Sequence, residues 1–213
     1  PGARGGHRGG ARPAGGPAGL HGPRLPDLLG AHRSFLQHAL RDDARRRGAA
    51  QDVPGSKWNA SIHCALVFGF LDTARALAAR AGRTSDIRVA AGLGELGETA
   101  RFLPTSDEAS RQVALVLACM HGHTRVVRLL LATGADPDRY NPEGHHAHST
   151  PLHQAVWGNH FDVVRLLVEH GARLDLRDRV YEGTPLDWAV YGERNEIADY
   201  LRDRSSATAP ATT

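Results

Sequence analysis

Apolar residues in the second half of the chain recur at the spacing of short, paired helices. Thr150-Pro-Leu-His-Gln-Ala155 is followed by Val156-Trp-Gly-Asn-His160 and then by Asp162-Val-Val-Arg-Leu-Leu167. Thr150 suits the position before a helix, and Pro151 suits the first helical position, where its missing N–H costs nothing. The apolar residues of each segment then fall on one helix face. The pattern therefore predicts two amphipathic helices joined by a short turn.

This pattern recurs at intervals along the chain. Clear copies are Val113-Ala-Leu-Val-Leu-Ala118 with Val126-Val-Arg-Leu-Leu130, and Thr184-Pro-Leu-Asp-Trp-Ala189 with Glu196-Ile-Ala-Asp-Tyr-Leu201. Two weaker copies span residues 60–77 and 85–103. A short amphipathic helix pair cannot bury its apolar stripe alone, so such units are stable only when at least three of them stack. The sequence therefore predicts a stack of about five repeats, of which the first two are degenerate.

The repeats resemble the ankyrin repeat family, whose pattern is TPLHxA, then GH, then VVxLLLxxGADxN. Residues 113–138 and 150–175 follow this pattern closely, and the resemblance covers about two thirds of the chain. It implies an all-α ankyrin-repeat helical solenoid, with short β-hairpin fingers between helix-turn-helix repeats, as in bacterial ankyrin repeat domain-containing proteins.

The chain departs from the family pattern at several positions. Asn159 and Glu193 stand where the family usually has glycine, and Asp187 replaces the motif histidine. Residues 141–148 enlarge one finger, whereas the first two copies leave almost no room for a finger.

The composition of the remaining segments predicts the domain organisation. Residues 1–26 are so rich in Gly, Pro and Arg that we expect a disordered tail. Residues 27–58 are expected to form a short helical segment and linker, a candidate N-terminal cap for the repeat domain at 59–204. Residues 205–213 are expected to be a second disordered tail. The first residue is not Met, so the sequence leaves the true start of the protein open.

The positive charge of the chain lies outside the repeats. The formal net charge is +3, but residues 1–50 alone hold nine Arg against three Asp, so the rest of the chain carries −3. An acidic repeat stack does not favour nucleic acid as its partner. Contact between nucleic acid and the Arg-rich N-terminal segment remains an alternative function.

Cysteine usage and hydropathy suggest where the protein works. Cys64 and Cys119 lie two repeats apart without a CxxC pair, so we expect two reduced thiols and a cytoplasmic location. No apolar run reaches the roughly 18–20 residues that cross a bilayer, so we expect no membrane contact. We expect a monomer.

Two motifs suggest a cofactor or a metal, and neither is complete. Gly92-Leu-Gly-Glu-Leu-Gly97 satisfies GxGxxG, but no acidic residue lies about 20 residues further on, as dinucleotide binding requires. His145, His146 and His148 precede His153, and four imidazoles could hold zinc or nickel. The resemblance instead implies that His153 hydrogen-bonds within its own turn, and no carboxylate or cysteine completes a ligand set. We therefore expect neither cofactor nor metal, and leave metal or small-molecule binding at this finger as an alternative.

The sequence favours a protein-binding module over an enzyme. It contains no GxSxG, HExxH or P-loop motif. The resemblance implies that one face of the first helices lines a concave groove, and Trp, Tyr and Met are favoured at the centres of interfaces. The hypothesis is that this face and the fingers bind another protein, whose identity is open. The expected contact residues are Leu117, Met120, Gln154, Trp157, Trp188 and Tyr191, with Arg139, Tyr140, Arg177 and Arg179 at a polar rim. The alternative is that some of them, above all Trp188, only cover the core.

Overall fold

The computed structural model describes residues 56–82 and 86–208, and in these ranges it is helical and contains no strand. The predicted all-α helical solenoid is confirmed. None of the helices in these ranges has the length and apolar character needed to cross a membrane. The expected tail at 1–26 and nearly all of the expected helical segment at 27–58 lie outside the described residues.

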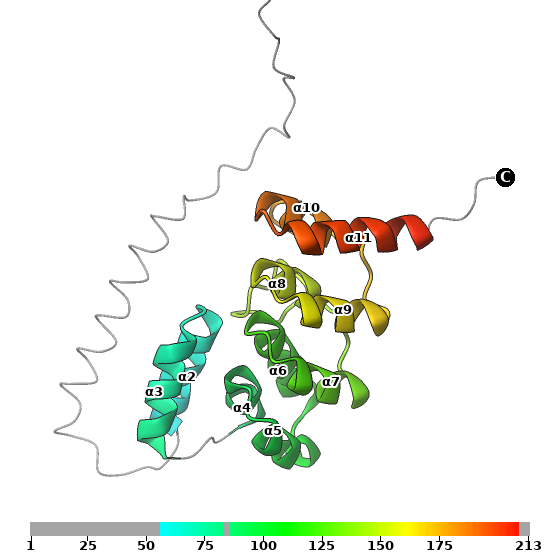
Figure 1. Cartoon of the computed structure of the whole chain (residues 1–213). Helices are drawn as coiled ribbons and strands as arrows, with labels where there is room; N and C mark the ends of the chain where they lie inside the picture. Colours follow the sequence, from blue (N-terminus) through cyan, green and yellow to red (C-terminus); the bar gives the residue numbers. More distant parts are fainter. Residues whose placement is uncertain (1–55, 83–85, 209–213) are drawn as a thin grey trace, which may run out of the picture. The chain divides into compact units, whose positions relative to one another are not determined.

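The helices form five consecutive pairs, each joined by a short turn (Figure 1). The pairs are α2 (Ser56–Val67) with α3 (Leu71–Ala81), α4 (Ile87–Leu93) with α5 (Leu96–Phe102), α6 (Glu108–Met120) with α7 (Thr124–Ala132), α8 (Pro151–Trp157) with α9 (Phe161–Glu169), and α10 (Pro185–Tyr191) with α11 (Asn195–Thr208). A short 3-10 helix, η1 (Leu103–Thr105), follows α5.

Side-chain caps fix where several of these helices begin. The Asp86 carboxylate accepts hydrogen bonds from the backbone N–H of Arg88 (2.8 Å) and Val89 (3.1 Å), ahead of α4. At the start of α10, Asp187 N donates to Thr184 Oγ1 (3.2 Å), and Thr184 N donates back to Asp187 Oδ2 (2.8 Å). Such reciprocal bonds satisfy two helix-end donors. Asp187 therefore caps α10 although it replaces the motif histidine.

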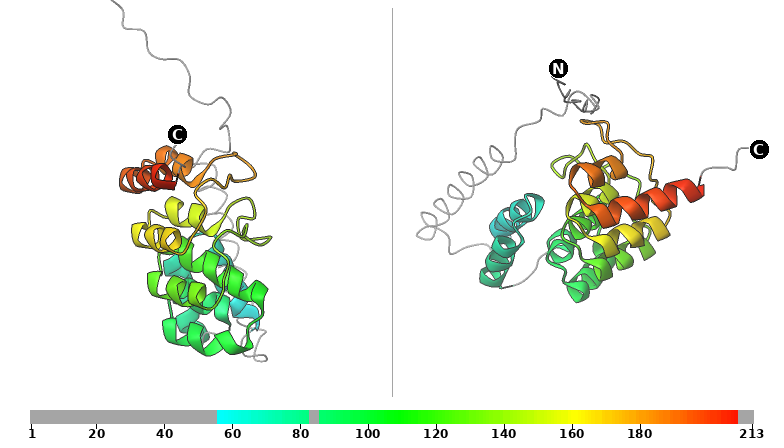
Figure 2. Two further views of the ribbon diagram at one scale, coloured as in Figure 1. Left: turned by 90° about the vertical axis from the view of Figure 1, so that its right-hand side faces the viewer. Right: turned by 45° about the horizontal axis from the view of Figure 1, so that its top comes forward.

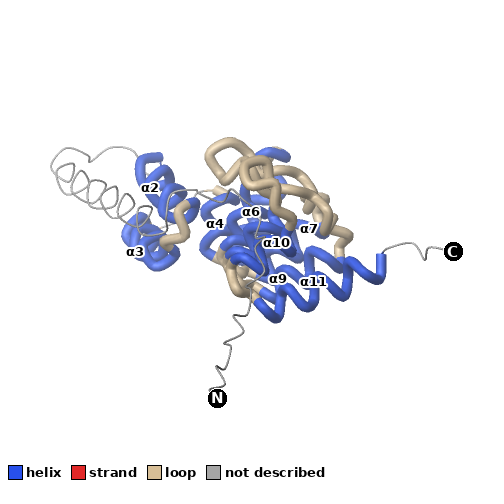
Figure 3. Tube along the Cα trace, turned by 90° about the horizontal axis from the view of Figure 1, so that it is seen from above, coloured by secondary structure: helices blue, strands red, loops and turns tan. Residues whose placement is uncertain are grey.

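The last four pairs stack in chain order. The first helices α4, α6, α8 and α10 lie next to one another, and the second helices α5, α7, α9 and α11 form a parallel outer row (Figures 1 and 3). Small buried residues such as Ala91, Ala118 and Ala155 line the contacts within the core. We call the side of α4, α6, α8 and α10 that points away from the outer row the inner face.

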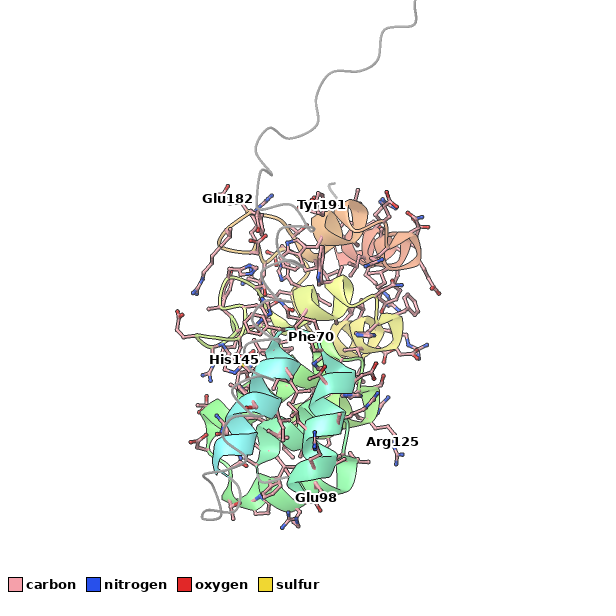
Figure 4. The ribbon with its side chains drawn as sticks, turned by 90° about the vertical axis from the view of Figure 1, so that its left-hand side faces the viewer. Phe70, Glu98, Arg125, His145, Glu182 and Tyr191 are labelled. Carbon is pink, nitrogen blue, oxygen red and sulfur yellow. The ribbon has the colours of Figure 1, made fainter. Side chains whose placement is uncertain are left out.

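The first pair does not extend this row but packs across the inner face of α4 and α6. One apolar cluster joins Ile62 and Leu66 of α2 to Leu93 of α4 and to Val113 and Leu117 of α6. Figure 4 shows α2 and α3 in front of the helices of the next two pairs. In a regular solenoid each repeat contacts only its neighbours. The predicted first repeat therefore forms the expected helix pair but reaches past its neighbour.

The connections between pairs are loops without paired strands in the described residues, so the short β-hairpin fingers expected from the resemblance are replaced by turns. The loops project from one side of the stack (Figure 2, left view). Backbone bonds close the two long loops, from Asn141 N to Ser149 O (2.8 Å) in one and from Asp178 N to Gly183 O (2.9 Å) and Glu182 N to Asp178 O (3.1 Å) in the other. These bonds belong to turns, and in the described residues they form no β-ladder.

The C-terminal helix is longer than predicted. Helix α11 continues to Thr208, so residues 205–208 are helical although they were expected to belong to a disordered tail. Ser205 Oγ donates to Leu201 O (2.8 Å), one turn earlier, which suits a serine within a helix. The other proposed domain boundaries stay predictions.

The turn inside each pair places one residue in the left-handed backbone region. Gly94 (φ 82°) and Gly122 (φ 75°) do so in the second and third pairs, and Asn159 (φ 58°) and Glu193 (φ 57°) in the last two. A Cβ added at Gly122 would lie 2.5 Å from His160 Nδ1 of the next pair. Glycine is therefore required at this turn both by φ and by the neighbouring ring.

We predict that Glu193→Gly stabilises the protein. A left-handed conformation costs a residue with a Cβ about 1–2 kcal/mol, and the greater freedom of glycine in the unfolded chain returns roughly 0.5–1 kcal/mol of that gain. The free energy of unfolding, measured by urea titration, should rise by about 0.5–1 kcal/mol. Gly122→Ala serves as the control with the opposite sign. It should lower the free energy of unfolding, because Gly122 has a positive φ and lies against the His160 ring. A destabilised Glu193→Gly variant would show that this turn is not left-handed in solution.

Candidate partner-binding site on the inner face

Two of the six predicted contact residues are buried and cannot touch a partner in this state. Leu117 is 0% exposed because α2 packs over it. Gln154 is 3% exposed, and its Nε2 donates to Ser149 Oγ (2.8 Å) at the end of the long loop before α8. The helical periodicity placed Leu117 and Gln154 on the inner face. It could not predict that α2 covers Leu117 or that the loop before α8 covers Gln154.

The other four residues leave an exposed surface toward the C-terminal end of the inner face. Trp157 is 41% exposed and Tyr191 is 63% exposed, whereas Met120 and Trp188 are half-buried. In Figure 4, Tyr191 lies at the far end of the stack from Glu98. Exposure along the inner face therefore rises in the direction away from α2.

Trp188 holds this surface together. Its ring packs edge-to-face against Trp157, with 5.9 Å between centroids, and against His153, with 5.0 Å. Its indole Nε1 donates a hydrogen bond to Asp178 Oδ2 (2.9 Å). The indole is thereby fixed in orientation, and one edge of the exposed Trp157 ring is supported. Trp188 therefore supports this surface and also packs against the hydrophobic core, so both roles stay open.

Asp178 is a buried carboxylate that organises the loop before α10. It is 1% exposed and accepts hydrogen bonds from Val180 N, Tyr181 N and Gly183 N as well as from the Trp188 indole. Burial raises the pKa of Asp178, but the hydrogen bonds from these four donors outweigh it, so the pKa lies below its ordinary value. The carboxylate is thus ionised at neutral pH and ties the loop to α10.

The same loop adds two exposed apolar residues that sequence reasoning missed. Val180 is 61% exposed and Tyr181 is 43% exposed. The Tyr181 ring lies 6.1 Å from His148, whose ring lies 5.9 Å from Trp188. Helical periodicity could not predict the positions of Val180 and Tyr181, because they lie in a loop. Their positions depend on the turn that the Asp178 carboxylate holds. We call Trp157, Val180, Tyr181, Trp188 and Tyr191 the aromatic patch.

The predicted rim residues mainly brace the loops against one another. Tyr140 Oη donates to Arg177 O (2.6 Å), and the Arg179 guanidinium lies 3.9 Å from the centre of the Tyr140 ring. Arg139 pairs with Glu108 at 2.6 Å. The Tyr140 contacts thus join the two long loops, whereas the Arg139 pair ties the first loop to the start of α6.

The histidines of the enlarged loop go to separate partners and do not converge on one site. His145 Nε2 lies 2.7 Å from His63 Nε2 of α2, and His146 Nε2 donates to Val67 O (3.0 Å). His153 Nδ1 bonds to Thr150 Oγ1 (2.8 Å), as the resemblance implies. Over the described ranges no group of three or more His, Cys, Asp or Glu is placed to hold a metal ion.

The GxGxxG segment spans the turn between two helices. Gly92 lies in α4, Gly94 ends that helix, and Gly97 lies in α5. A dinucleotide site needs a strand before the glycine turn, and here a helix precedes it. The segment belongs to the second repeat.

Comparison with known proteins gives one family. A family model described as "Ankyrin repeats (3 copies)" matches residues 87–178 and 143–210. Together these ranges contain the helices from α4 to α11, whereas the first pair lies outside them.

Relatives with this repeat come from several kinds of protein. Mouse "Ankyrin repeat and SOCS box protein 6" is 39% identical over 46% of this chain and 22% of its own length. Bovine "Cyclin-dependent kinase 4 inhibitor B" is 30% identical over 57% of this chain and 92% of its own length. The chain thus spans about a fifth of the first relative. Since these relatives are mammalian, a bacterial type of repeat stays a prediction.

We predict that Asp178→Ala strongly destabilises the protein, because it leaves three backbone N–H groups and one indole N–H without their acceptor. Each buried unsatisfied donor costs about 1–3 kcal/mol, and partial solvation reduces the sum, so we expect a loss of about 2–4 kcal/mol in urea unfolding. Asp175→Ala removes an exposed carboxylate that pairs with Arg173 in the same loop. That control should change the stability by less than about 1 kcal/mol.

The pH dependence has a definite sign. Because the folded pKa of Asp178 is lowered, its contribution is present above the ordinary aspartate pKa of about 3.9 and is lost as the pH falls below it. The stability difference between the wild-type protein and Asp178→Ala should shrink under acid conditions. An equal difference at neutral and acid pH would contradict the assigned role of the carboxylate.

Proposed function

Because this chain belongs to the ankyrin repeat family, whose repeats are generally protein–protein interaction modules, we propose that it binds another protein through the aromatic patch. The observation that carries the proposal is the exposure of Trp157 (41%) and Tyr191 (63%) on one face. Large exposed aromatic side chains are costly to leave in water and dominate the energy of interfaces when buried.

The aromatic patch is suited to binding because it is already ordered. Trp188 is held by Asp178 and packs against Trp157, so little side-chain freedom remains to be lost at the centre of the surface. Pre-organisation of this kind increases affinity by lowering the entropy cost of association. Tyr140, Arg177 and Arg179 at the edge hold one another and add polar groups around the apolar centre.

The relatives support a protein partner of some kind. The names of three of them, two human and one bovine, describe inhibitors of a cyclin-dependent kinase, that is, proteins that act on another protein. For this chain we propose only the class of partner, a folded protein with an apolar surface or pocket that accepts Trp157 and Tyr191.

Three further expectations go with this proposal. We propose that the chain acts without catalysis, as a monomer and in the cytoplasm. Free thiols at Cys64 and Cys119 fit a reducing compartment. Nucleic-acid contact through the Arg-rich residues 1–50 is the second candidate, supported by their net charge of +6. It would show strong salt dependence.

We predict that Trp157→Ala with Tyr191→Ala abolishes capture of the partner. The full chain serves as bait, captured proteins are identified by mass spectrometry, and affinities are then measured by titration. Truncating an interface hot spot costs about 2 kcal/mol or more, which corresponds to roughly 30-fold weaker binding for each residue.

Phe68→Ala is the matched control, because Phe68 is an aromatic residue with similar exposure (42%) outside the aromatic patch. Deletion of residues 1–50 separates the two candidate functions. Partner capture should survive both changes. If the deletion abolishes binding while the Trp157/Tyr191 double variant binds normally, the N-terminal segment is the binding site and the proposal is wrong.

A further inference from the structure

The part of the inner face nearest the N-terminus is apolar and is covered by the first helix pair. Val89 and Gly92 of α4 and Leu117 of α6 occupy the inner-face positions that Gln154, Trp157 and Trp188 occupy further along. They are buried because α2 lies on them, with Leu66 of α2 at 0% exposure. The inner face is thus apolar and covered at α4 and α6, whereas further along it exposes Trp157 and Tyr191.

Gly92 of α4 lies directly against Leu66 of the covering helix α2. A Cβ added to Gly92 would lie 2.7 Å from Cδ1 of Leu66, well inside van der Waals contact. Gly92 has an ordinary helical backbone, so no turn requires a glycine there. The missing side chain therefore makes room for Leu66.

Three histidines from distant parts of the chain hold the end of α2 in this place. His121 Nε2 donates to Leu66 O (2.9 Å), and His146 Nε2 donates to Val67 O (3.0 Å). His145 Nε2 meets His63 Nε2 at 2.7 Å, 82 residues apart in sequence. We call these three contacts the histidine latch. Figure 4 shows His145 beside the first pair.

In the later repeats a histidine just after the turn of one helix pair donates a hydrogen bond to a backbone carbonyl of the pair before it, and the histidine latch takes the place of this bond at the first pair. His123 Nε2 donates to Gly92 O (3.0 Å), and His160 Nε2 donates to Met120 O (2.9 Å), each from one pair to the pair before it. Glu95 stands at the corresponding position of the second pair. A glutamate side chain has no N–H to donate to a carbonyl oxygen, and the equivalent Val67 O takes its donor, His146, from the enlarged loop.

We propose that the α2–α3 hairpin is a releasable internal ligand of the inner face, and that its release opens α4 and α6 to an apolar, amphipathic helix of a partner protein. Helix α2 itself indicates the chemistry of that partner, because α2 packs the apolar side chains of Ile62 and Leu66 against α4 and α6. This inference goes beyond the proposed function and does not rest on it, because the two surfaces are separate.

Burial disfavours protonation of three histidines at these contacts, His63, His121 and His145. Burial lowers the pKa of His63 to about 4, with His145 and Arg88 acting in the same direction and Asp86 opposing them. Burial likewise lowers the pKa of His121 to about 4, and His123, His160 and Arg75 add to this, while the bond to Leu66 O opposes it. Burial and Arg88 also lower the pKa of His145. Once released, the imidazoles regain an ordinary pKa near 6.5.

The sign of the pH effect follows from this difference. Histidines whose folded pKa is lowered stabilise the closed state above about pH 6.5 and lose that contribution as the pH falls toward 4. Acidification therefore favours release.

The test is hydrogen–deuterium exchange of the full chain at pH 7.4 and pH 5.0, with exchange times scaled for the intrinsic rates. Amides of α2 and α3 should exchange about tenfold faster at the lower pH for each of His63, His121 and His145 that becomes protonated, while amides of α8 and α9 keep their protection. Substituting His63, His121 and His145 by Gln should remove this pH response, because Gln does not titrate in this range.

Gly92→Leu tests the position of the cover directly. It should expose α2 and α3 to exchange already at pH 7.4, whereas Gly97→Leu should not, because nothing lies within 4 Å of a Cβ at Gly97. Protection of α8 and α9 reports that each variant is folded. The proposal is overturned if α2 and α3 keep their protection at pH 5.0, or lose it only together with α8 and α9. Unchanged protection of α2 in a folded Gly92→Leu protein would overturn it too.

Discussion

Apolar burial stabilises the stack, and one hydrogen bond recurs between consecutive helix pairs among the last four. A side chain just after the turn of one pair donates to a carbonyl near the end of the first helix of the pair before it: His123 to Gly92 O, His160 to Met120 O, and Arg194, at 3.4 Å, to Trp157 O. The bond satisfies a helix-end carbonyl that would otherwise lack a partner. It also fixes the distance between pairs, since the His123 and His160 rings lie against Gly94 and Gly122, where a Cβ would collide.

The first pair shows what happens when this bond is missing. Glu95 cannot donate to Val67 O, and the carbonyls at the end of α2 are served by His121 and His146 instead. The pair thereby lies across the inner face, where it buries Leu117 and leaves Trp157 and Tyr191 open. The division of the inner face into a covered apolar half and an exposed aromatic half thus coincides with one departure from the repeat pattern.

Much of the fold could be predicted from the sequence because the repeats depend on local signals. Pro at the first helical position, a capping residue before it and a left-handed residue at the turn mark the helix pairs without tertiary information. The inner-face position of Trp157 and Tyr191 follows from periodicity. The burial of Leu117 and Gln154 and the role of Asp178 could not be predicted, because each depends on contacts with distant segments. The exposure of Val180 and Tyr181 could not be predicted either, because loop residues show no hydrophobic periodicity.

The position of α2 on the inner face of α4 and α6 can be measured by nuclear Overhauser effects in the wild-type chain at neutral pH. We expect cross-peaks from the Leu66 methyl groups to the Gly92 Hα protons and to the Leu117 methyl groups, because the Leu66 side chain packs against Gly92 and shares a cluster with Leu117. Cross-peaks between Leu66 and α4 alone, with none to Leu117, would instead place the first pair in line with the others and show that α2 does not cover α6.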